Sequence, residues 1–240
     1  MAKGLREWVE TDVKHQKTKP LKWISEEHFF RDPSRPVFSD SSYFFSPADG
    51  IILYQRVVEP DECIVDIKGE SYSLRAAMQD DVFDKTSLVI GIFMTMYDVH
   101  INRIPYSGVL SYKELDPITT FNQPMLDVER GLVDGLTIDF NKADYLHNNQ
   151  RILNRIYTPD LHQYYYILQI ADYDVDHITP FNLKQNAVMS QNRRFSQIRF
   201  GSQVDLIIPV SDQYRFEPVQ EVETHVEAGI DPLVSISRNG

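Results

Sequence analysis

The chain has very little cysteine and no long apolar run, and each of these absences excludes some classes of protein. Cys63 is the only cysteine among 240 residues, which excludes an internal disulfide and a thiolate zinc site, so we expect no metal. A reducing compartment, the cytoplasm, is the simplest expectation. The longest apolar run, residues 88–97, is shorter than the ~20 residues that a membrane-spanning helix needs. Residues 1–17 also lack the apolar core of a signal peptide.

Basic residues are scarce as well. The 24 lysines and arginines stand against 35 acidic residues, a net charge of −11, which argues against a nucleic-acid partner. The exception is the N-terminus, where a helix expected over residues 3–15 is followed closely by Lys17, Lys19 and Lys22. One interpretation is a peripheral contact of residues 1–23 with anionic lipid headgroups. The other is a helix that packs on the rest of the protein and leaves its lysines in solvent.

What the chain does have is a succession of short segments rich in β-branched and aromatic residues. They lie at residues 51–58, 62–69, 87–97, 108–115, 151–157, 163–171, 195–200 and 203–210. This pattern predicts a mostly β (α+β) fold, a β-sandwich or hybrid barrel with one or two N-terminal helices. A short helix is expected within residues 72–80 and a closing hairpin within residues 224–237. We divide the chain into an N-terminal helical and basic segment, 1–36, and a main domain, 37–240.

Three short motifs carry residues capable of chemistry. Asp49 lies in SPADG, His100 follows Asp98 in DVHINRIPYSG, and the pair Gly201-Ser202 lies between two predicted strands in RFGSQVDLIIP. A glycine followed by a serine is a place where a chain can cut itself, because the hydroxyl attacks a carbonyl that no side chain obstructs. Each motif alone is also compatible with a turn or a structural histidine.

Taken in order along the chain, these motifs resemble those of the phosphatidylserine decarboxylase family. The resemblance runs from about residue 43 to residue 235 and includes FFSPADGII, IKGESYSLRAAM, MTMYDVHINRIPYSGVL and IRFGSQVDLIIP. The third and fourth segments are close to the forms found in the short members of the family. THVEAG is similar to its final glycine turn.

The resemblance implies self-cleavage and a cofactor made from the chain itself. Ser202 would attack the Gly201 carbonyl, and the cut would leave a large chain, 1–201, and a small chain, 202–240. Ser202 would become a pyruvoyl group, the electron sink of a carboxy-lyase that converts phosphatidylserine, or a close analogue, to phosphatidylethanolamine and CO₂. The resemblance also implies a homodimer.

A serine hydroxyl needs a base within hydrogen-bond reach before it can attack. His100 is the expected base, since an imidazole titrates near neutrality, and it could act again as the acid that protonates the product. Asp49 is expected to orient this imidazole or to stabilise its charged form.

The sequence departs from the family at three places. Arg103 stands where longer members have a second histidine, and it is expected either to bind the substrate carboxylate or phosphate or to form a structural ion pair. Gln203 replaces the arginine that usually follows the serine in short members. An acidic run at residues 172–176 replaces a glycine- and arginine-containing segment, which would suit a phosphate-bearing headgroup less well.

These departures leave two other functions open. One keeps the pyruvoyl chemistry on a soluble amino acid, and the other is a non-catalytic member that acts as a binding protein. Of the remaining histidines, none has a partner at metal-ligand spacing, and all are expected on the surface or in loops: His28, His147, His162, His177 and His225, with His15 in the N-terminal helix.

Overall fold

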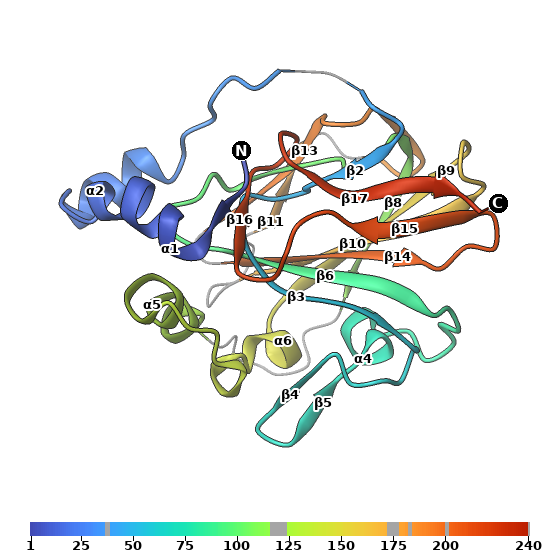
Figure 1. Ribbon diagram of the computed structural model, residues 1–240, viewed down its shortest axis with the longest axis horizontal. Helices are drawn as coiled ribbons and strands as arrows, with labels where there is room; N and C mark the ends of the chain where they lie inside the picture. The colour runs from blue at the N-terminus through green and yellow to red at the C-terminus, as the bar shows by residue number, and fades with distance from the viewer. Residues whose placement is uncertain (37–38, 116–123, 172–177, 182–183, 200–201, 240) are drawn as a thin grey trace.

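The centre of the molecule is a nine-stranded antiparallel sheet, seen in a computed structural model that describes residues 1–36, 39–115, 124–171, 178–181, 184–199 and 202–239. In spatial order its strands are β1 (Lys3–Gly4), β16 (Thr224–Val226), β3 (Gly50–Val58), β6 (Ser87–Met94), β14 (Ser202–Pro209), β10 (Gln163–Ile170), β9 (Arg151–Thr158), β8 (Gly108–Leu115) and β12 (Ala187–Met189). Within the described residues β1 and β12 do not pair, so the sheet stays open. The mostly β prediction is confirmed, in layered form rather than as a closed barrel (Figure 1).

Two small antiparallel sheets cover one face of the large sheet. The first has the order β11 (Ile178–Pro180), β13 (Arg194–Ile198), β7 (Ile101–Arg103), and the second the order β15 (Tyr214–Pro218), β17 (Pro232–Arg238), β2 (Tyr43–Phe45). Apolar side chains of all three sheets form one buried cluster, which includes Phe44, Ile92, Phe195, Val204 and Leu233. This burial of apolar surface is what holds the small sheets against the large one.

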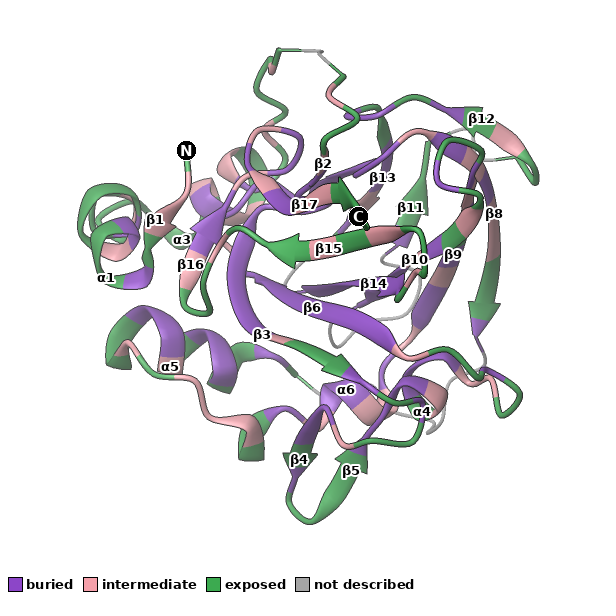
Figure 2. Cartoon of the chain, turned by 45° about the vertical axis from the view of Figure 1, so that its right-hand side comes forward, coloured by how far each residue is buried: buried purple, intermediate pink, exposed green. Residues whose placement is uncertain are grey.

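Helices and a hairpin cover the opposite face. They are α4 (Leu74–Met78), α5 (Leu126–Gly135), the 3₁₀ turn η3 (Phe140–Lys142), α6 (Tyr145–Asn148) and the hairpin β4 (Val65–Ile67) with β5 (Glu70–Tyr72). In Figure 1 they lie below β3 and β6. Because both faces are covered, every residue of β6 and β14 is buried (Figure 2). This burial explains why β6 reads as a nearly continuous apolar run, whereas β14 also buries the polar residues Ser202, Gln203 and Asp205.

The N-terminal helix expected over residues 3–15 is present. It consists of α1 (Leu5–Trp8), the π-helical turn η1 (Val9–Val13) and α2 (Lys14–Gln16), and a second helix follows as α3 (Leu21–Trp23) and η2 (Ile24–His28). Leu5, Trp8 and Val13 are buried in the cluster under the large sheet, so the first helix packs on the body of the protein. Among the helices that the structure describes, none has the length and apolar character to cross a membrane. The domain boundary at residue 36 stays a prediction.

The closing hairpin predicted over residues 224–237 is wrong. β16 enters the large sheet between β1 and β3, whereas β17 pairs with β15 and β2. A turn redirects the chain between the two sheets, fixed by the Asp231 carboxylate, which accepts a hydrogen bond from the Glu227 amide at 2.9 Å. Val226 and Leu233 are buried in the cluster between those sheets, and this burial favours the separation over a local pairing.

Candidate active site

Ser202 is the first residue of β14 and lies opposite Met94, the last residue of β6. Its side chain is fully buried, and its hydroxyl donates to the Met94 sulfur at 3.2 Å. The same sulfur accepts a hydrogen bond from the Asn102 amide at 3.6 Å. A thioether is a weak acceptor, so the hydroxyl is placed without being strongly held. Gly201, the predicted partner in cleavage, lies outside the described residues.

His100 is buried directly before β7. Its Nδ1 lies 3.1 Å from the backbone oxygen of Asp98. Because a carbonyl only accepts hydrogen bonds, Nδ1 carries the proton and Nε2 carries the lone pair. Nε2 has no hydrogen-bond partner among the described residues, and the Phe29 ring packs 4.1 Å from the imidazole. Burial lowers the pKa of His100 to about 4, so near pH 7 the ring is neutral with a free basic nitrogen.

The side chain of Asp98 faces a second histidine. Its Oδ1 lies 2.7 Å from His225 Nε2, and its Oδ2 accepts hydrogen bonds of 2.8 Å from the amide and hydroxyl of Thr95. Burial alone would raise the pKa of Asp98, but His225 and Thr95 outweigh it and hold the pKa below its ordinary value. Trp8 stacks on His225 at 4.6 Å. Asp98 therefore stays charged while its backbone oxygen fixes His100.

The expectation of a surface or loop position is wrong for His225, which is buried in β16. Its pairing with Asp98 joins residues 127 positions apart, and no local pattern reports such a contact. The only signal was its place in THVEAG, the segment assigned to the final turn.

Asp49 is buried and bound to an arginine. Arg35 donates two hydrogen bonds to its carboxylate at 2.7 and 2.6 Å, and the Ala228 amide donates a third at 2.8 Å. No hydrogen bond joins Asp49 to His100 in the described part of the chain. The next residue must be glycine, because a Cβ on Gly50 would lie 2.1 Å from the Phe93 carbonyl oxygen. The SPADG turn thus presses against β6.

Arg103 passes under the turn that contains Gly229. Its Nη1 donates to the Asn192 carbonyl at 3.0 Å, and its Nη2 lies 4.0 Å from Asp32. A Cβ on Gly229 would lie 2.9 Å from the Arg103 Cδ, and the φ of Gly229 is +68°. Glycine is needed there both for the backbone and for the passage of the arginine.

Four side chains of one irregular segment surround these groups, and the sequence analysis named none of them. In this segment, residues 29–35, which we call the strap, Phe29 covers His100 and Arg35 binds Asp49. Arg31 donates to the Asp98 carbonyl at 3.3 Å, and Asp32 faces Arg103. Irregular backbone has no periodic pattern, and the one turn-favouring proline of the strap, Pro33, indicates a loop rather than a site.

Gln203 points to the opposite side of β14 and joins a buried polar network. Its amide donates to the Asp205 carboxylate and to the Tyr54 hydroxyl, each at 2.7 Å, and its oxygen accepts from Tyr145 at 2.7 Å. Tyr54 and Tyr72 donate to Asp205 at 2.9 Å. Burial raises the pKa of Asp205 to about 6 against these hydrogen bonds. The acidic run at 172–176 and His177 lie outside the described residues.

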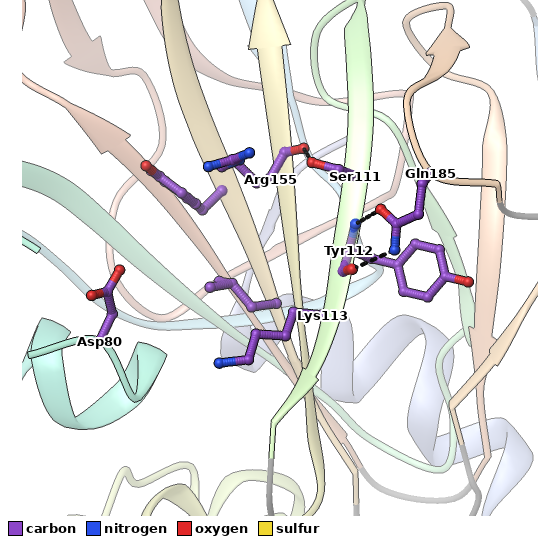
Figure 3. A pocket seen from close by; sticks show the side chains of 8 residues that line it. Asp80, Ser111, Tyr112, Lys113, Arg155 and Gln185 are labelled. Carbon is purple, nitrogen blue, oxygen red and sulfur yellow. Dashed lines mark hydrogen bonds between the residues drawn. The ribbon is translucent and has the colours of Figure 1, made fainter.

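A separate cavity lies away from these motifs. Figure 3 shows it between the end of α4 and strands β8, β9 and β10, with a volume of about 370 Å³. Gln185 closes one side through hydrogen bonds with the backbone of Tyr112. Its lining contains none of the predicted site residues. Among the described residues no group of three or more histidine, cysteine or acidic side chains is placed to hold a metal.

The sequence of this chain is similar to those of one protein family. The phosphatidylserine decarboxylase family model matches residues 27–231. The chain is 33% identical over 181 residues, 75% of its length, to a phosphatidylserine decarboxylase proenzyme of Erythrobacter litoralis, and 32% identical over 186 residues, 77% of its length, to one of Novosphingobium aromaticivorans. It is 27% identical over 186 residues to a putative archaetidylserine decarboxylase proenzyme of Methanocaldococcus jannaschii, covering 77% of this chain and 78% of that one.

The lengths of these relatives differ. The match covers 62% of the Erythrobacter protein and 63% of the Novosphingobium protein, so the chain spans less than two thirds of either. The matched region of the family model begins at residue 27, just before the strap, and includes Asp49, His100 and Ser202.

Proposed function

Because this chain belongs to the phosphatidylserine decarboxylase family, we propose that it is a self-processing, pyruvoyl-dependent decarboxylase that converts phosphatidylserine, or a close analogue, to phosphatidylethanolamine and CO₂. One observation carries the proposal. The Ser202 hydroxyl is buried with only a weak acceptor, and the buried His100 presents a neutral imidazole whose Nε2 is unpartnered among the described residues. Met94 links the two, because its sulfur accepts from Ser202 and from Asn102, two residues beyond His100.

The first reaction is the cut. His100 Nε2 takes the hydroxyl proton as Ser202 Oγ attacks the Gly201 carbonyl carbon. The C–N bond then breaks as His100 passes this proton to the Ser202 nitrogen, which leaves an ester and a free amine. Loss of the Ser202 α-proton then breaks the Cβ–Oγ bond and releases Gly201 as a carboxylate terminus. Water hydrolyses the remaining dehydroalanine to a ketone and ammonia. The products are chains 1–201 and 202–240.

The surroundings of Ser202 fit a pyruvoyl group at this position. The residue is fully buried between β6 and β10, and a ketone there needs no more room than the serine. Once formed, the group supplies an electron sink for the breaking C–C bond. The apolar surroundings favour the conversion of a charged carboxylate to neutral CO₂, and His100 is the residue that exchanges a proton with the product carbon.

The two aspartates then take different roles. We assign the orientation of His100 to Asp98, whose carbonyl fixes the Nδ1–H tautomer and whose side chain is anchored by His225. Asp49, first expected to orient His100, acts as a positioning residue that ties Arg35 and the Ala228 amide to the SPADG turn. Arg103 belongs to the substrate-binding part of the site.

Intact-mass analysis of the purified protein tests the cut. We expect two fragments, the smaller beginning at residue 202, in place of the full 27.9 kDa chain. Ser202→Ala should leave one full-length species without activity, and Ser87→Ala, which alters another fully buried serine at the start of β6, should process normally. A single full-length species in the wild-type protein would overturn the proposal and favour a non-catalytic binding protein.

Released CO₂ tests the substrate. Phosphatidylserine in mixed micelles should yield CO₂, whereas a panel of free amino acids should not. The reverse result would assign the pyruvoyl chemistry to a soluble amino acid.

Access to a lipid substrate requires contact with a membrane surface, and we assign it to residues 1–23. In support, Leu21 is 66% exposed and lies between Lys19 and Lys22. Leu21→Glu should weaken co-sedimentation with phosphatidylserine vesicles, with Val210→Glu, an exposed valine just after β14, as the control. Equal vesicle binding by both variants would contradict a role for residues 1–23 in membrane contact. The homodimer stays a prediction, tested by analytical ultracentrifugation.

A further inference from the structure

Two adjoining cavities open beside the strap. The first, of about 360 Å³, is lined by Asp32, Pro33, Ser34, Arg35, Arg103 and Arg194. The second, of about 440 Å³, is lined by Asp32, Phe181, Arg193 and Arg194. They share Asp32 and Arg194 and so adjoin each other, and we call the two together the arginine pocket.

The arginine pocket carries an excess of positive charge in a strongly acidic protein. Four arginines line it, Asp49 pairs with Arg35, and Asp32 is the one acidic lining residue among those that the structure describes. The Arg103 side chain is 8% exposed, and its Nε has no hydrogen-bond partner among the described residues. Burial lowers the pKa of Arg103, and the nearby charges of Arg35 and Arg194 lower it further. A bound anion would relieve this repulsion.

Asp32 occupies the position that such an anion would take. One carboxylate oxygen lies 4.0 Å from Arg103 Nη2, and the other is hydrogen-bonded to Arg194 Nη1. The Asp32 side chain is 34% exposed and belongs to the irregular strap, so it can leave the pocket without breaking a helix or a strand. Arg194 is 52% exposed and open to an incoming ligand.

We propose that Arg103 and Arg194 bind the phosphodiester of the substrate headgroup, and that Asp32 is an internal competitor that this phosphodiester displaces. The proposal rests on the decarboxylase function proposed above. A phosphodiester carries one negative charge and two free oxygens, so it replaces the Asp32 carboxylate charge for charge and can contact both guanidinium groups.

The substrate carboxylate fits this pocket less well. It must leave as neutral CO₂, and two arginines would stabilise its charged form before the reaction more than during it. The buried, weakly bonded surroundings of Ser202 suit that group, while the exposed rim at Arg194 suits the phosphate, from which the lipid chains must extend outward.

Calorimetric titration with glycerophosphoethanolamine tests the pocket, because this compound carries the phosphodiester but no carboxylate to lose. We expect Asp32→Asn to bind about tenfold tighter than the wild type and Arg194→Gln about tenfold weaker, the change of about 1.4 kcal/mol that one charge-assisted hydrogen bond supplies. Arg103→Gln should weaken binding further, and Arg215→Gln, an exposed arginine on β15, should change nothing. Ethanolamine without phosphate should not bind.

Three outcomes overturn the proposal: unchanged affinity in Arg194→Gln, weaker binding in Asp32→Asn, or inorganic phosphate bound as tightly as glycerophosphoethanolamine, which would indicate a free-phosphate site. If Arg103→Gln fails to fold, the affinities of Arg194→Gln and Asp32→Asn still test the proposal. The proposals fail separately. An uncut chain that binds the probe through these arginines loses the decarboxylase function alone, and a cut, active chain indifferent to them loses the pocket alone.

Discussion

Ser202 and Gln203 are neighbours on β14, yet their side chains lie in opposite surroundings. On the side of Gln203, the amide and the Asp205 carboxylate are bound by three tyrosine hydroxyls. On the side of Ser202, the hydroxyl has a thioether for a partner, and Nε2 of His100, two residues before the Asn102 that shares this thioether, has no partner among the described residues. The two sides of one strand therefore serve different purposes. The side of Gln203, which we call the satisfied face, fixes the backbone through hydrogen bonds. The side of Ser202, which we call the under-bonded face, leaves reactive atoms available.

The largest effect is expected when the base on the under-bonded face is removed. His100→Gln should slow cleavage by at least about 10²-fold, because the hydroxyl then has no proton acceptor. In the wild type, burial holds the pKa of His100 at about 4, so the base is already neutral above that value. Cleavage, followed by gel densitometry, should stay constant from about pH 5 to 8. A cleavage rate that falls as the pH is lowered through 6.5 would instead indicate an imidazole with an ordinary pKa.

On the satisfied face, Asp205 should make the free energy of unfolding depend on pH. The folded pKa of Asp205 is raised from 3.8 to about 6, so its favourable contribution is complete below pH 3.8 and is lost as the pH rises through 6. Between those limits the wild type should lose about 3 kcal/mol of unfolding free energy relative to Asp205→Asn. Urea titrations in a Ser202→Ala background, which keeps the chain whole, measure the difference. Parallel curves for the two proteins would contradict it.

Gln203→Leu should weaken the satisfied face without touching the reactive one. It removes the amide oxygen that accepts from the Tyr145 hydroxyl and the amide that donates to Asp205, at a cost of about 2 kcal/mol in unfolding free energy. Cleavage at 20 °C should continue. The matched control is Gln55→Leu, a half-buried glutamine at the sheet edge. Loss of cleavage with unchanged stability would mean that Gln203 acts in the chemistry.

The smallest effect is expected from the positioning pair behind His100. His225→Gln can still donate a hydrogen bond to Asp98 but removes the imidazole that lowers the pKa of Asp98, so cleavage should slow by about tenfold or less. The separating readout is the pH profile, which should shift only if Asp98 no longer fixes His100. An unchanged rate and profile would leave His225 a structural residue.

Local sequence pattern encodes part of this molecule. The apolar run at 87–97 predicted β6, the β-branched segment 203–210 predicted β14, and the motifs selected Asp49, His100 and Ser202. Arg35 and the rest of the strap were missed, because contacts made by irregular chain leave no periodicity. His225 and the final hairpin were misplaced for a related reason, since alternation identifies a strand but not the sheet that the strand joins.

The position of β14 has one more consequence. If the chain is cut before Ser202, the fragment 202–240 keeps β14 between β6 and β10, paired with β6 along its whole length and with β10 from Gln203 to Ile207. It also supplies the Ala228 amide and His225 to the other fragment. Two polypeptides then share a single core, and neither has a complete one. Heat or urea would have to pull apart a tightly held heterodimer, so unfolding of the mature protein becomes bimolecular and depends on concentration, while that of the uncut chain does not.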